Sequence, residues 1–174
     1  MKKTIYIAMM VFSLLLMNFA CSEEISRDFT CIRISEIMAS NSSRILSAAD
    51  GTAPDWIEIF NSSDKDISLK GLCLSDSKKK LEKFVFPDVI LPAGEYMIIF
   101  CTGEESTEDQ EIRVGFKLAA EGEKVVLSYE GVILDKVTFE AQLRDISLAL
   151  DENGNWMQTV TPTPGAANVI TGLN

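Results

Sequence analysis

The chain has 174 residues, with 16 basic and 26 acidic side chains, a formal net charge of −10 and no histidine. An acidic surface repels phosphate backbones, so the composition argues against a nucleic-acid-binding protein. The lack of histidine removes the usual general base and the commonest metal ligand. We therefore expect no metal, no cofactor and no catalysis.

The first twenty residues have the features of an export signal. Lys2 and Lys3 precede an apolar run from Ile5 to Ala20, which is short for a transmembrane helix. The run ends in NFAC, and an Ala directly before Cys21 resembles the lipobox of bacterial lipoproteins, although Asn18 stands where Leu is usual. We expect residues 1–20 to be removed and Cys21 to carry the lipid, with ordinary cleavage and secretion as the alternative.

Residues 21–30 are polar and acidic, which is typical of a solvated tether between a membrane and a domain. Acidic residues just after a lipidated cysteine also resemble the export signals of surface-exposed lipoproteins in some Gram-negative bacteria. The resemblance implies an exported protein, anchored by lipid in the bacterial outer membrane and facing outward. Loss of Lys2 and Lys3 with the leader would make the net charge −12.

Three cysteines remain beyond Cys21, namely Cys31, Cys73 and Cys101. Exported proteins can form disulfides, but an odd number leaves at least one thiol free or paired outside the chain. Their wide spacing argues against zinc. We expect each to be a small apolar side chain in or beside a strand.

From Cys31 onward, apolar residues alternate in short runs separated by turn-forming residues, which predicts a single all-β domain, a sandwich or a barrel. Glu130-Gly131 and Asn153-Gly154 predict hairpin turns. The runs that predict strands are 32–37, 56–61, 69–75, 84–86, 95–101, 114–116, 124–129, 132–139 and 145–150, followed by a return at Trp156.

Residues 54–61 read PDWIEIFN and place Asp55 and Glu58 beside a tryptophan. Alternation puts Ile57 and Ile59 on one face and Glu58 with Phe60 on the other. Asp55 and Glu58 lie an odd number of positions apart and so point in opposite directions. We predict that both carboxylates lie on the strand surface and do not form an acid/base pair.

Six short motifs follow one another along the chain, namely Ile34–Met38, Asp55–Asn61, Gly71–Asp76, Phe84–Pro87, Leu91–Tyr96 and Thr163–Asn168. Their order and spacing resemble the lamin tail domain family. The resemblance covers about residues 31–168, nearly all of the expected mature chain, and leaves a short tail at 169–174.

The resemblance implies an immunoglobulin-like β-sandwich with no activity of its own, which serves as a platform for protein partners. Two positions depart from the pattern. Leu72 stands where many bacterial relatives have Trp, and 147–150 read SLAL where relatives often carry S-x-G-R. The resemblance therefore implies no arginine at that place to brace a nearby carboxylate, and Arg144, a few residues away, is the candidate substitute.

Three residues are candidates for binding. Phe60 and Trp156 could stack against a ligand, such as a sugar ring. Alternation places Asp135 on the apolar face of its strand, so either a bulge turns it outward or it has a partner, for which Lys136, Arg144 and a backbone turn are the options. Asp151 begins a stretch like the start of a calcium loop, but the later ligand positions do not fit and the hairpin is favoured.

These features favour a non-catalytic, lipid-anchored surface protein whose domain binds another protein or mediates adhesion. The alternative is a carbohydrate-binding surface lipoprotein. A metal-dependent hydrolase that uses carboxylates is the third and weakest hypothesis.

Overall fold

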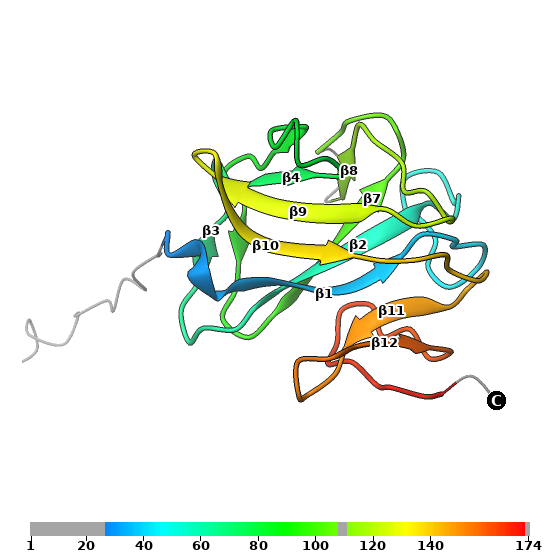
Figure 1. Ribbon diagram of the computed structural model, residues 1–174. Helices are drawn as coiled ribbons and strands as arrows, with labels where there is room; N and C mark the ends of the chain where they lie inside the picture. The colour runs from blue at the N-terminus through cyan, green and yellow to red at the C-terminus, as the bar shows by residue number, and fades with distance from the viewer. Residues whose placement is uncertain (1–26, 108–110, 173–174) are drawn as a thin grey trace, which may run out of the picture.

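The computed structural model describes residues 27–107 and 111–172. Within these ranges the chain is a β-sandwich with one short 3-10 turn, Phe29–Cys31, and no α-helix (Figure 1). One sheet has six strands, which in spatial order are β12 (Trp156–Thr159), β11 (Ser147–Leu150), β1 (Ile32–Met38), β2 (Asp55–Asn61), β7 (Tyr96–Cys101) and β8 (Ile112–Val114).

The second sheet packs over the inner face of the first and has four strands. Its spatial order is β10 (Val132–Thr138), β9 (Lys124–Tyr129), β4 (Cys73–Ser75) and β5 (Phe84–Val85). A two-stranded sheet pairs β3 (Ile67–Ser68) with β6 (Ile90–Leu91). All pairings are antiparallel except that of β7 with β8.

The core lies between the two large sheets and follows the alternation of the sequence. Ile57 and Ile59 of β2 face Val125 and Leu127 of β9 within one continuous cluster of buried side chains. Period-two alternation puts every second residue of a strand on one face, so each sheet contributes one apolar layer. The expected all-β sandwich is confirmed.

Most expected strands are present, although their ends differ. The hairpins at Glu130-Gly131 and Asn153-Gly154 are confirmed as the turns of β9–β10 and β11–β12. The run 69–75 is not one strand, because Gly71 turns with a φ of 85° and only Cys73–Ser75 pairs. A residue with a Cβ is strained at that φ, which explains why the strand starts after the glycine.

A β-bulge in β1 changes which side chains face outward. Ile34 pairs with Ile59 and Glu36 pairs with Glu58, so Ser35 is the extra residue between them. A bulge adds one residue to one strand and shifts its alternation. As a result Ile34 and Ile37 both enter the core, whereas Glu36 lies on the outer face beside Glu58.

Asp135 fastens the two sheets to each other. β10 has a register shift between Ile133 and Asp135, and the Asp135 carboxylate accepts a hydrogen bond from the backbone N–H of Ile34 at 2.9 Å. β11 pairs with β1 only at Glu36 and Ile37. On that side of β1, residues 32–35 therefore have no strand partner among the described residues. The structure therefore contains both the bulge and partners for the carboxylate, which are the backbone N–H groups of Ile34 and of Lys136, the latter at 2.7 Å.

The three described cysteines are free thiols. Cys73 and Cys101 are buried in β4 and β7, and Cys31 ends the 3-10 turn before β1. The expectation of at least one free thiol is confirmed. None of the helical segments in the described ranges is long and apolar enough to cross a bilayer.

Candidate functional site

The outer face of the six-stranded sheet carries three rows of side chains across β1, β2 and β7. Strand register aligns the rows, because residues paired across neighbouring strands point to the same face. The rows are Met38–Trp56–Phe100, Glu36–Glu58–Ile98 and Arg33–Phe60–Tyr96. Two of these rows are covered by other segments, and the third lines a groove.

The loop between β1 and β2 covers the first row. Trp56 and Met38 are fully buried and pack with Phe100 and Ile45, which lies in the loop. The indole N–H of Trp56 is buried and has no hydrogen-bond partner among the described residues. The row is thus a second, smaller core on the outer side of the sheet.

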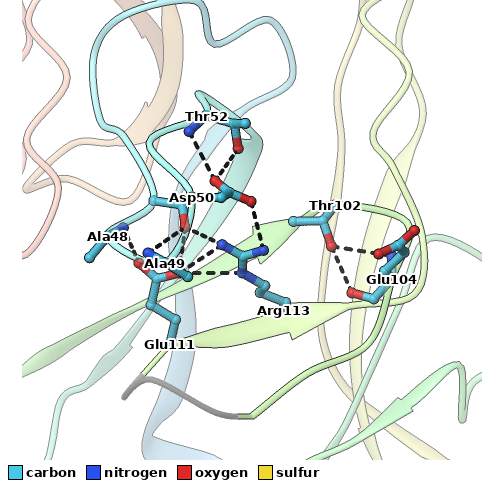
Figure 2. A network of polar contacts seen from close by, with 9 residues as sticks. Ala48, Ala49, Asp50, Thr52, Thr102, Glu104, Glu111 and Arg113 are labelled. Carbon is cyan, nitrogen blue, oxygen red and sulfur yellow. Dashed lines mark hydrogen bonds and ion pairs between the residues drawn. The ribbon is translucent and has the colours of Figure 1, made fainter.

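Arg113 of β8 holds this loop in place (Figure 2). Its guanidinium donates to Asp50 at 3.0 Å, to Glu111 at 3.3 Å and to the hydroxyl of Ser47. The Glu111 carboxylate also accepts from the backbone N–H of Ala48 at 2.5 Å. Arginine presents several donors in one plane, so a single side chain can bind several groups of a loop.

A polar cavity of about 380 Å³ lies beside this cluster and is lined by Asp50, Asp55, Thr102, Glu104 and Arg113, among others. Most of its charged groups already have partners within the protein. Hydrogen bonds from Thr52, followed by those from Arg113, lower the pKa of Asp50 to about 2. We therefore interpret this cluster as a structural clamp.

Glu36 and Glu58 form the second row, and both side chains are fully buried. Residues 160–172, here called the closing segment, cover them. Glu58 accepts from the hydroxyl of Ser35 at 2.6 Å and from the backbone N–H of Gly165 at 2.6 Å. Glu36 accepts from the hydroxyl of Ser147 and from the backbone N–H of Thr163, the latter at 3.1 Å.

No lysine or arginine pairs with either carboxylate in the described ranges. Burial raises the pKa of Glu58 to about 7, and the neighbouring Glu36 adds to the increase. Burial also raises the pKa of Glu36, against the opposing effect of its hydroxyl and N–H donors. Two buried carboxyls without a cation favour states in which at least one is protonated.

The prediction that Glu58 lies on the strand surface is wrong. Alternation assigned the side chain to the correct face, but Gly165, more than a hundred residues later, covers that face. Asp55 is half-buried and accepts from the backbone N–H of Asn41 at 2.9 Å. Glu36 was not singled out as a site residue in the sequence analysis, and its place in the motif Ile34–Met38 was the only sign that it matters.

Arg33, Phe60 and Tyr96 form the third row, which lines a groove of about 470 Å³. The rings of Phe60 and Tyr96 stack at 4.5 Å between centroids with 22° between their planes. Because Tyr96 covers one face of Phe60, only the opposite face of Phe60 is left for a ligand. The other walls of the groove include Leu150–Glu152 at the β11–β12 turn and Ala167–Asn168 from the closing segment.

The groove combines used and unused polar groups. Asp151 accepts from the backbone N–H groups of Asn153 and Asn155, so its carboxylate holds the hairpin turn. Asn168 donates to the carbonyls of Ser35 and Leu150, both at 2.9 Å. Arg33 and Glu152 are exposed and take part in none of the described ion pairs, so they are available to a partner.

The other candidate residues lie elsewhere. Trp156 is half-buried, packs against the main core and is not among the groove-lining residues. Asp135 binds β1 as described above, and Arg144 is exposed and forms none of the described ion pairs. Cys21 lies outside the described residues. No group of three or more potential metal ligands of the His, Cys, Asp or Glu type occurs within 27–107 and 111–172.

Two facing, mainly antiparallel sheets around one core define a β-sandwich domain of the immunoglobulin-like class. The lamin tail domain family model matches residues 27–162, well over half of the chain, and the chain therefore belongs to the lamin tail domain family. A search of curated proteins found no significant match. The family comprises non-catalytic immunoglobulin-like domains, and membership suggests a protein-interaction module.

Three of the motifs that carry the family resemblance meet at the carboxylate row. Ile34–Met38 supplies Glu36, Asp55–Asn61 supplies Glu58, and Thr163–Asn168 supplies the N–H groups that bind them. Although the three motifs lie far apart in the sequence, they form one polar site. This site attaches the end of the domain to its first two long strands.

Proposed function

We propose that this chain is a lipid-anchored protein of the bacterial outer membrane, exposed on the cell surface, whose lamin tail domain binds a protein partner without catalysis. The observation that carries the binding role is the uncovered third row. Arg33 and Phe60 face a groove, whereas the neighbouring rows are covered by segments of the same chain. Unpaired Arg and aromatic side chains are enriched where interfaces gain most of their binding energy.

The buried carboxyls support a non-catalytic role. Glu36 and Glu58 are the nearest equivalent of an acid/base pair in the fold, but both are fully buried beneath the closing segment. Their oxygens accept hydrogen bonds from protein hydroxyl and N–H groups. A substrate would have to displace that segment before it reached either group.

The anchor is tested by comparing the wild type with Cys21→Ala in intact cells. Membrane and soluble fractions are separated after treatment of the cells with a protease, and the chain is detected by immunoblotting. We expect a membrane-bound wild type that the protease removes and a soluble Cys21→Ala variant. A wild type that is soluble would contradict the anchor, and one that is membrane-bound but protected would contradict surface exposure.

The groove is tested with the variants Phe60→Ala and Arg33→Glu. We expect both to weaken binding of the chain to its protein partner, while Arg144→Glu, a change of the same charge at an exposed arginine away from the groove, has no effect. The probe is the surface of host cells or of neighbouring bacterial cells, and binding of the chain to these cells is measured by flow cytometry. Equal binding of all four proteins would contradict a role for the groove.

Carbohydrate binding is the second candidate, and the free face of Phe60 favours it. An aromatic face beside exposed polar groups such as Arg33 and Glu152 is suited to one sugar ring and its hydroxyls. A glycan array separates the two candidates, since saturable glycan binding that is lost in Phe60→Ala would favour the carbohydrate over the protein partner.

A further inference from the structure

The closing segment is attached to the sheet through two groups that lack a compensating charge. Thr163 and Gly165 donate backbone N–H groups to Glu36 and Glu58, and Asn168 adds side-chain bonds to Ser35 and Leu150. The segment itself contains no ionisable side chain between 160 and 172. The attachment of Thr163 and Gly165 therefore depends on two fully buried carboxyls, while Asn168 is held independently of them.

None of the charged groups near Glu36 and Glu58 among the described residues supplies a positive charge that would balance them. Arg33 of β1 and Glu152 of the β11–β12 turn are exposed, and Asp151 is occupied by its own turn. Tyr96 is the titratable group that β7 adds, with Glu95 beside it, and β11 and β12 add none. Arg44 lies near the start of the segment, where it donates to the carbonyl of Val160 at 3.4 Å.

Ionisation of both carboxyls would place two negative charges in a site without a cation or solvent. The cost of an uncompensated buried charge is large, and proteins relieve it by keeping the proton or by admitting water. Here the simplest route for water is to lift the middle of the closing segment, because residues 165–167 are exposed and hydrogen bonds from Thr163, Gly165 and Asn168 hold this part to the sheet.

We propose that the closing segment is a proton-dependent cover, which stays closed while the Glu36–Glu58 pair retains a proton and opens as the pair ionises. Opening removes Ala167 and Asn168 from the wall of the groove and exposes the carboxylate row beside Phe60. Its effect on ligands rests on the proposed binding function, whereas the opening itself is measured without a ligand.

The pH window follows from proton linkage. In the open state Glu58 regains an ordinary carboxyl pKa of 4.5, and in the closed state burial raises its pKa to about 7. Between these values the open state has lost a proton that the closed state retains. The opening equilibrium therefore rises roughly tenfold per pH unit in this interval and levels off above it.

The test is amide–water exchange of Gly165 and Thr163, measured by NMR on the full chain in detergent micelles from pH 4.5 to 8. Rates are corrected for intrinsic exchange at each pH. We expect protection of both amides to fall with rising pH up to about 7 while core amides such as those of Ile57 and Leu127 stay protected. Constant protection of Gly165 across the range would overturn the proposal.

Two variants sharpen the test. Glu58→Gln cannot ionise, so we expect Gly165 to keep its low-pH protection at pH 8, whereas a wild-type profile in this variant would overturn the proposal. Glu152→Gln is the matched control because it alters a groove-lining carboxylate outside the pair. If Glu58→Gln does not fold, the wild-type profile alone decides the question.

The groove experiment is separate from this one. If the closing segment opens with pH but Phe60→Ala and Arg33→Glu leave binding unchanged, the proposed groove function fails and the cover stands. If those variants abolish binding while Gly165 stays protected at every pH, the groove stands and the cover fails.

Discussion

Glu58 accepts one hydrogen bond from a neighbouring strand and one from a segment more than a hundred residues away. Because burial raises the pKa of this carboxyl in the folded chain, its charge at a given pH differs between the folded and unfolded states. Below pH 4.5 the carboxyl is protonated in both folded and unfolded chains. From 4.5 to about 7 the unfolded chain loses the proton and the folded chain keeps it, so the free energy of unfolding falls as pH rises.

We therefore predict that Glu58→Gln removes a pH-dependent loss of stability on the order of 3 kcal/mol between pH 4.5 and 7. Urea unfolding monitored by circular dichroism at several pH values measures this difference. Glu95→Gln, at an exposed carboxylate directly before β7, serves as the control and should keep the wild-type slope. Parallel pH profiles for Glu58→Gln and wild type would refute the prediction.

Trp56 combines full burial with an indole N–H that has no partner among the described residues. Trp56→Ala should destabilise the domain by roughly 3–5 kcal/mol, because it leaves a cavity under the covering loop. Trp56→Phe should cost clearly less, since it keeps most of the ring and removes an unsatisfied donor. Denaturant unfolding of both variants checks the order, and equal losses would contradict it.

At the scale of elements, the bulges of β1 and β10 set the connections between the sheets. The bulge in β10 places Asp135 where its carboxylate reaches the backbone N–H of Ile34. Asp135→Ala should destabilise the domain by about 1–3 kcal/mol, because that donor loses its partner. Asp135→Asn keeps an acceptor and should cost less, as unfolding midpoints will show; equal costs would mean that the hydrogen bond is unimportant.

The covering loop before β2 depends on β8 through Arg113. We predict that Arg113→Met loosens the loop, because Asp50, Glu111 and Ser47 lose their common donor. Trp56 should then become more accessible to acrylamide, as measured by fluorescence quenching. Trp156 also emits, so the measurement is made in a Trp156→Phe background, and unchanged quenching would show that the loop holds without the clamp.

For the whole molecule, a small basic cluster and a strongly acidic overall charge have opposite effects on binding to nucleic acid. Lys78 lies close to Lys136 and Lys124, and this like-charge repulsion lowers the pKa of Lys78. The chain as a whole, these lysines included, is strongly acidic, with a formal net charge of −10. Long-range repulsion should exceed the attraction of one small basic cluster at low ionic strength, where screening is weak.

We therefore predict that the chain does not bind duplex DNA in a mobility-shift assay at about 50 mM salt. The Cys21→Ala variant suits this measurement because we expect it to be free of membrane. A shift that disappears in Lys78→Glu would show that the lysine cluster acts as an anion site despite the net charge.

The groove and the expected anchor are close along the chain. Arg33 follows Cys21 by twelve residues, which span at most about 40 Å when fully extended. The 3-10 turn that precedes β1 and the start of β1 lie at the same end of the sandwich (Figure 1). A partner in the groove would therefore be bound near the membrane surface if Cys21 carries the lipid.

The all-β class, the inward face of a strand without a bulge such as β2, and the positions of both hairpin turns follow from the sequence alone. These features depend on neighbours one to four residues apart, such as the alternation around Ile57 and the Asn153-Gly154 pair. The motifs also predicted the family, because their order along the chain is itself a property of the sequence.

Which outward faces are covered depends on how distant segments of the folded chain meet. Glu58 and Phe60 both point outward from β2, yet the closing segment buries Glu58 while Phe60 lines a groove. The bulge that adds Ser35 shifts the alternation of β1 in a way that no local pattern indicated, whereas the bulge before Asp135 was one of two alternatives that alternation left open. Burial depends on contacts between residues far apart in the chain, and alternation reports only the face on which a side chain lies.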